Sequence, residues 1–89
     1  MLLLPAEITH ANGRSCVHML LQALRAEDAV AVADAGNLLK FDSCALAVLL
    51  ECRREAQILG KTFSVRNLPT SLRALAALYG AAELLPAAP

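Results

Sequence analysis

The sequence has few aromatic residues and no net charge. It contains no tryptophan, and its three aromatic side chains are Phe41, Phe63 and Tyr79. Eight basic residues are balanced by eight acidic ones. A protein that binds nucleic acid needs an excess of basic residues to neutralise the phosphates. One that binds single strands also needs aromatic side chains on which the bases stack. We therefore expect no nucleic-acid partner.

Long apolar runs are also missing. No run reaches the roughly 18 apolar residues that a membrane-spanning helix requires, because Asp28, Asp34, Glu51 or Arg73 interrupts each candidate. Residues 1–5 are too short for the apolar region of a signal peptide and have no basic start. These absences predict a cytoplasmic protein that does not insert into the membrane.

The cysteines and histidines form no recognisable ligand pattern. Cys16, Cys44 and Cys52 are odd in number and include no CxxC pair, so we expect free thiols rather than a disulfide framework or a zinc site. His10 and His18 lie eight residues apart with few carboxylates nearby. A metal site is therefore not expected.

What the sequence does have is a large apolar fraction in a short chain. Its 89 residues fit one domain over 1–89. The apolar fraction is 57%, against roughly 45–50% for a typical soluble domain. Part of this excess suits a surface that a partner covers.

Strand and helix patterns alternate along the chain. The run 29–33 is apolar throughout and has the length of a strand buried on both faces of a parallel sheet. Residues 35–40 read as a loop, and 87–89 are expected to fray. The expected elements are strands over 2–4, 29–33 and 63–65, helices over 15–25, 43–59 and 71–79, and a closing segment over 84–86. This alternation predicts an α/β fold with a mostly parallel sheet.

Glycine and proline mark the ends of the expected elements. Pro5 stops the first strand, and Gly60 has the position of a glycine just after a helix. Pro69 is expected at the first position of the third helix, and Gly80 ends that helix.

The most informative stretch is 41–50, Phe-Asp-Ser-Cys-Ala-Leu-Ala-Val-Leu-Leu. It resembles the signature of STAS domains, the family of sulfate transporters and anti-sigma-factor antagonists. There a strand ends in Asp-Ser or Asp-Thr, two small residues follow, and an apolar helix begins. The resemblance covers roughly residues 26 to 86. The ending Leu78-Tyr79-Gly80 with 84–86 is most similar to the MlaB-like STAS subunits of Mla phospholipid-transport ABC systems.

Two departures from the family pattern stand out. STAS domains usually begin with two strands before the first helix, and this chain has room for one, so we expect either a sheet that lacks an edge strand or a trimmed N-terminus. Ala45 stands where the family often has glycine. Alanine is still small enough for a partner to approach closely.

A helical wheel of 43–59 separates two faces. The expected core face holds Ala45, Val48, Leu49, Cys52, Ala56 and Leu59. The expected partner-binding face holds Ser43, Ala47, Leu50, Arg54 and Ile58, with Leu46 at its margin. A solvated face should be polar, so an apolar outer face with a hydroxyl at one end favours docking. Arg54 could pair with a carboxylate of the partner.

Two residues at the start of this helix have both ordinary and functional interpretations. Asp42 is expected to be its N-cap. Ser43 could be a common first-turn residue. In the similar families the aligned residue is phosphorylated or touches the partner, and phosphate at Ser43 would place negative charge in a packed interface and could release the partner.

Catalysis finds no support in the sequence. Ser43 has no evident base, and no glycine-rich phosphate loop occurs. We therefore expect no enzyme activity, no cofactor and no metal. The resemblance implies an accessory subunit that binds and supports the ATPase of a phospholipid-transporting ABC complex, which maintains outer-membrane lipid asymmetry. Such a subunit is held at the inner membrane only through its partners. The alternative is an anti-sigma-factor antagonist regulated by phosphorylation of Ser43.

Overall fold

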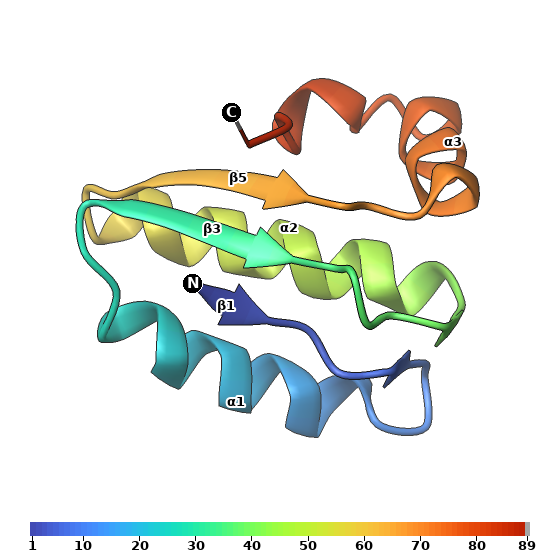
Figure 1. Ribbon diagram of the computed structural model, residues 1–89, viewed down its shortest axis with the longest axis horizontal. Coiled ribbons are helices and arrows are strands. Elements are labelled where there is room, and N and C mark those ends of the chain that lie inside the picture. The colour runs from blue at the N-terminus through green and yellow to red at the C-terminus, as the bar shows by residue number, and fades with distance from the viewer. Residues whose placement is uncertain (89) are drawn as a thin grey trace.

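A computed structural model describes residues 1–88, with strands and helices alternating as expected (Figure 1). The elements are β1 (Leu2–Leu3), β2 (Glu7–Ile8), α1 (Gly13–Arg25), β3 (Val30–Asp34), β4 (Lys40–Phe41), α2 (Ser43–Ile58), β5 (Thr62–Arg66), α3 (Thr70–Leu78) and the 3-10 helix η1 (Ala82–Leu84). The α/β class is confirmed.

The main sheet has the order β1-β3-β5, with all strands parallel. Helix α1 connects β1 to β3, and α2 connects β3 to β5. The strands point toward the end of the molecule where both helices begin (Figure 1). The carboxyl ends of the strands and the N-termini of α1 and α2 therefore meet there.

The chain has two strands before its first helix, so the expectation of one was wrong. Pro5 ends β1, and pairing resumes at β2, which lies parallel to β4 with Glu7 opposite Lys40. The expected loop 35–40 is correspondingly shorter by one residue, because Lys40 belongs to β4. Each of these strands is two residues long, too short for an alternating pattern to be visible in the sequence.

The main sheet is buried on one face only. Along β3, Ala31 and Ala33 are buried, whereas Val30 is 65% exposed. In the view of Figure 1, α2 passes behind β3 and β5, α1 lies beside β1, and no helix of the described residues crosses in front of β3. The expectation that 29–33 is buried on both faces was therefore wrong. The pattern misled because the outward residues of this run are apolar too.

Both glycines that were expected to end helices do so. Gly60 and Gly80 each have φ near +71°, the left-handed region that favours glycine. The Gly60 N–H donates to Gln57 O, and the Lys61 N–H donates to Ala56 O, which together make a Schellman motif.

The Lys61 side chain also caps the C-terminus of α1. Its Nζ donates to the carbonyl oxygens of Leu24 at 2.9 Å and Arg25 at 3.2 Å, and to that of Glu27. A positive charge thus sits at the C-terminus of α1, where the helix dipole favours it.

The C-terminal segment extends the sheet. Val65 N donates to Pro86 O, and Ala88 N donates to Val65 O, both at 2.9 Å. Fraying at Ala87 and Ala88 was therefore wrongly expected, because the open edge of β5 offers backbone groups that need partners. Pro89 lies outside the described residues.

Pro69 proves to be the N-cap of α3, one position before the place expected for it.

The core lies between the sheet and the helices. Its largest fully buried side chains come from every layer: Leu4, Ile8, Leu24, Leu49, Leu72, Leu85, Val65 and Cys52. Within residues 1–88, no helix combines the length and the apolar character that crossing a membrane would require.

Candidate partner-binding surface

Helix α2 begins where the sequence predicted, at Ser43, and Asp42 is its N-cap. Asp42 has an extended backbone, and its Oδ1 accepts a hydrogen bond from Cys44 N at 2.8 Å. One of the otherwise unpaired N–H groups of the first turn is satisfied in this way.

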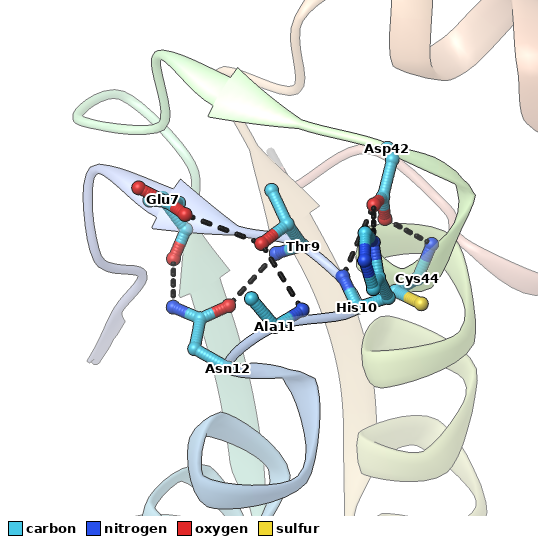
Figure 2. A network of polar contacts seen from close by, with 7 residues as sticks. All are labelled: Glu7, Thr9, His10, Ala11, Asn12, Asp42 and Cys44. Carbon is cyan, nitrogen blue, oxygen red and sulfur yellow. Dashed lines mark hydrogen bonds and ion pairs between the residues drawn. The ribbon is translucent and has the colours of Figure 1, made fainter.

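The other oxygen of Asp42 binds His10, a partner that the sequence did not reveal. Asp42 Oδ2 accepts from His10 N at 3.0 Å and lies 3.1 Å from His10 Nδ1 (Figure 2). The hydrogen bonds from His10, backbone first, and then the one from Cys44 N lower the pKa of Asp42 from 3.8 to about 2. The residues are 32 positions apart, and only the pairing of β2 with β4 brings them together.

The turn between β2 and α1 holds His10 in this position. Asn12 Oδ1 accepts from Thr9 N, and Asn12 Nδ2 donates to Glu7 O, both at 2.8 Å (Figure 2). Thr9 Oγ1 donates to Glu7 Oε2 at 3.2 Å. Asn12 is the N-cap residue of α1, but its side chain closes the turn and makes no capping hydrogen bond to the helix. The N-termini of the two helices are joined through His10 and Asp42.

Four of the five predicted partner-binding residues are exposed on one strip of α2. They are Ser43, Ala47, Arg54 and Ile58, and we call this strip the α2 outer face. Ser43 starts it at the helix N-terminus, and Ile58 is 70% exposed near its other end. These residues lie on one side of the helix because they are spaced by four, seven and four residues, which is about one, two and one helical turns.

The wheel was wrong about three leucines. Leu50 is partly buried against the core, and Leu46, placed at the margin of the outer face, is a core residue with 4% exposure. Leu59, placed in the core, follows the last helical residue and is 40% exposed. Because α2 packs against α1, β5 and α3 at once, its free strip is narrower than half of the helix. The other core residues of the wheel are buried as expected: Ala45, Val48, Leu49, Cys52 and Ala56.

A shallow groove of about 280 Å³ runs between α1 and α2 beside the α2 outer face. Ala47 lies in it, together with Gly13 and Val17 of α1. A Cβ added at Gly13 would lie 3.8 Å from the Cβ of Cys44, so the helices come close at this point. The full lining is His10, Gly13, Arg14, Val17, Cys44, Ala47, Val48 and Glu51.

All three cysteines are free thiols. Burial raises the pKa of Cys52 to about 12 and also raises that of Cys16. Cys44 is half-buried, and burial, followed by the nearby Asp42 carboxylate, raises its pKa as well. None of the three has the lowered pKa of a reactive nucleophile.

A family model described as the MlaB STAS domain matches residues 1–86 of this sequence. The chain belongs to the MlaB-like STAS domain family. The resemblance seen in the sequence is therefore confirmed, and it extends further toward the N-terminus than residue 26. No curated protein matches the sequence of this STAS domain.

The fold is similar to that of a solved STAS structure. The anti-sigma-factor antagonist SpoIIAA in its unphosphorylated form superposes with a TM-score of 0.73. The match covers 98% of this chain and 76% of the SpoIIAA chain, at 16% sequence identity. At that identity the likeness establishes the STAS fold.

Proposed function

We propose that this STAS domain is an accessory subunit of a phospholipid-transporting ABC complex, where it binds and supports the ATPase subunit. It acts by binding, not by catalysis, and contributes to outer-membrane lipid asymmetry. The match of residues 1–86 to the MlaB-like family carries the proposal. Such a role places the domain in the cytoplasm, held at the inner membrane by its partners.

The geometry of the α2 outer face supports this proposal. Ser43 and Ala47 are small and exposed, so a partner can approach the helix backbone closely. The hydrogen bonds of Asp42 to His10 and Cys44 hold the N-terminus of α2 in place, and they do not use the Ser43 side chain. A prearranged surface loses little conformational entropy on binding.

The test is a pull-down of the cognate ATPase by the domain and by a Ser43→Arg variant. An unpaired charge buried in an interface typically costs several kcal/mol, so binding should be lost while circular dichroism stays unchanged. Ser71→Arg is the matched control, because Ser71 is an exposed serine in the first turn of α3. If the unmodified domain fails to bind the ATPase, the proposal is wrong.

The second candidate is an anti-sigma-factor antagonist switched by phosphorylation of Ser43. The fold likeness to SpoIIAA and the exposed hydroxyl at a helix N-terminus favour it. Phosphate is well tolerated at such a position. Intact mass spectrometry of the domain isolated from its own cells distinguishes the two: a phosphoserine at residue 43 favours the antagonist, and co-purification of a transporter ATPase favours the accessory subunit.

A further inference from the structure

The main sheet has one side that no helix of the described residues covers. Helix α2 passes behind β3 and β5 in Figure 1, and the front of β3 is free. Sheets whose strands are all parallel are almost always covered on both faces, and this sheet is parallel throughout. We call its uncovered side the open face. Its members are the outward-pointing residues of the three strands, together with the residue before β1: Met1, Leu3, Val30, Val32, Asp34, Thr62, Ser64 and Arg66.

Half of the open face is apolar. Leu3 is 63% exposed, Val30 is 65% exposed, and Met1, two positions before Leu3, is 55% exposed. Val32 lies between them in the middle strand and is half-buried. Apolar side chains gathered on one exposed surface are typical of an interaction site.

The charges of the open face are one acid and one base in the same row. Asp34 of β3 and Arg66 of β5 are partners in the strand register. Hydrogen bonds from Gly36 N at 2.8 Å and Asn67 Nδ2 at 3.2 Å, and then the charge of Arg66, lower the pKa of Asp34, so the carboxylate is charged at neutral pH. Neither Asp34 nor Arg66 forms an ion pair among the described residues. Each can therefore accept an opposite charge from another molecule.

The other charges near the open face do not change this balance. Glu27 forms an ion pair with the Met1 ammonium at 2.6 Å. Asp28 is exposed but precedes β3, beyond the last paired row, which joins Val30 to Thr62. The paired rows carry no net charge, whereas an anionic membrane or nucleic acid selects a surface with an excess of basic residues.

We propose that the open face binds the open face of a second copy of this chain, about a two-fold axis that runs parallel to the strands between β3 and β5. This axis places β3 of each copy over β5 of the other, so each Arg66 faces the Asp34 of the other copy. Val30 of each copy lies over Thr62 of the other, and Leu3 lies over the C-terminal segment beside β5. Stacked sheets pack in this way about 10 Å apart, with their strands aligned to within about 30°.

The size of the open face determines how strong this contact is. Strands about 4.8 Å apart, with about 3.3 Å per residue, give three strands of up to five residues a flat area of roughly 240 Å². A stable complex buries about 800 Å² per partner. We therefore expect a weak dimer that forms at about 0.1–1 mM protein. A contact of this strength becomes effective when two copies are held in one assembly, where effective concentrations reach the millimolar range.

The first test is sedimentation equilibrium of the purified domain from about 10 μM to 1 mM. The average mass of the unmodified domain should rise toward that of a dimer. Val30→Glu should weaken self-association at least about tenfold, because it places an unpaired charge between the two sheets. Leu78→Glu is the matched control, because Leu78 is a 78% exposed aliphatic residue at the end of α3, outside the open face. Its self-association should stay within about twofold of the unmodified domain's.

The second test exchanges the charges. Arg66→Asp alone places two acidic groups opposite each other at both contacts, and Asp34→Arg alone places two basic groups there. Each variant should therefore self-associate at least about tenfold more weakly. An equal mixture of the two variants should form heterodimers, because every acidic group then faces a basic one. Circular dichroism checks that each variant is folded, and the Val30→Glu and Leu78→Glu pair leaves the hydrogen bonds of Asp34 intact.

Each outcome decides for or against the second copy, independently of the proposed function. A monomeric mass up to 1 mM overturns the proposal. Self-association that survives Val30→Glu and is lost in Leu78→Glu assigns the contact to the helices and also overturns it. Folded charge variants whose mixture associates no better than either one alone overturn the two-fold arrangement. Loss in Val30→Glu alone, with recovery in the mixture, supports it.

Discussion

At the scale of single residues, Asp42 is the point at which local and long-range structure meet. One carboxylate oxygen caps α2, and the other holds His10 of the loop before α1. Both sets of hydrogen bonds favour the charged carboxylate, which is why its pKa falls to about 2. The charge of this one residue thus links the two helix N-termini that carry the candidate surface.

We expect the stability of the domain to depend on this charge in acid. A lowered pKa contributes stability that is fully present above the ordinary value of 3.8 and is lost as the pH falls through about 2. Asp42→Asn keeps a capping oxygen but has no charge to lose. Urea unfolding should therefore show the variant less stable at pH 7, with the gap closing between about pH 4 and pH 2. A gap that is constant over this range would contradict the role of the carboxylate charge.

The cysteines should differ in reactivity. Cys52 is buried and its pKa is raised to about 12, whereas Cys44 is half-buried near the surface groove. Under native conditions at pH 8, iodoacetamide should modify Cys44 first and Cys52 on the order of 100-fold more slowly. Peptide mass spectrometry over time measures both rates. Equal rates would mean that the core around α2 opens freely.

At the scale of elements, successive residues of α2 differ sharply in how far they are buried. Leu46 is 4% exposed in the core, and Ala47 is exposed in the groove. Leu46→Ala should destabilise the domain by about 2–5 kcal/mol. Ala47→Glu should change stability by less than about 0.5 kcal/mol and yet abolish ATPase binding. Chemical denaturation and the pull-down together check the pair, and unfolding by Ala47→Glu would show that the outer face is misplaced.

The length of a repeating pattern decided how well each element could be predicted. The sixteen residues of α2, with a capping aspartate and Gly60 shortly after its end, allowed its start to be predicted correctly, its end to within one residue, and most of its core face. The two-residue strands β2 and β4 gave no period, so the second strand and the His10–Asp42 contact were missed. A helical wheel divided into two faces also assumes that the rest of the protein covers the helix on one side only. It misplaced Leu46 and Leu50 because α2 is covered by three neighbours.

At the scale of the whole molecule, partner binding should appear as added stability. A ligand that binds only the folded state stabilises it by about 2.7 kcal/mol at a concentration 100 times its Kd. The melting temperature of this small domain should therefore rise as cognate ATPase is titrated in, whereas Ser43→Arg should show no rise. Differential scanning calorimetry measures the melting temperature, and an unrelated protein added in place of the ATPase is the control. A flat response of the unmodified domain would count against the accessory-subunit proposal.

The strand order also constrains how the chain is made. β3 is the middle strand of the sheet, and its pairings with β1 and β5 each join residues about 30 positions apart. During synthesis β3 can pair with β1 early, but its other edge stays unpaired until β5 has left the ribosome. An unpaired edge is a template for strands of other chains. The nascent chain is therefore most open to misassembly in the interval between these two strands, while α2 is being translated.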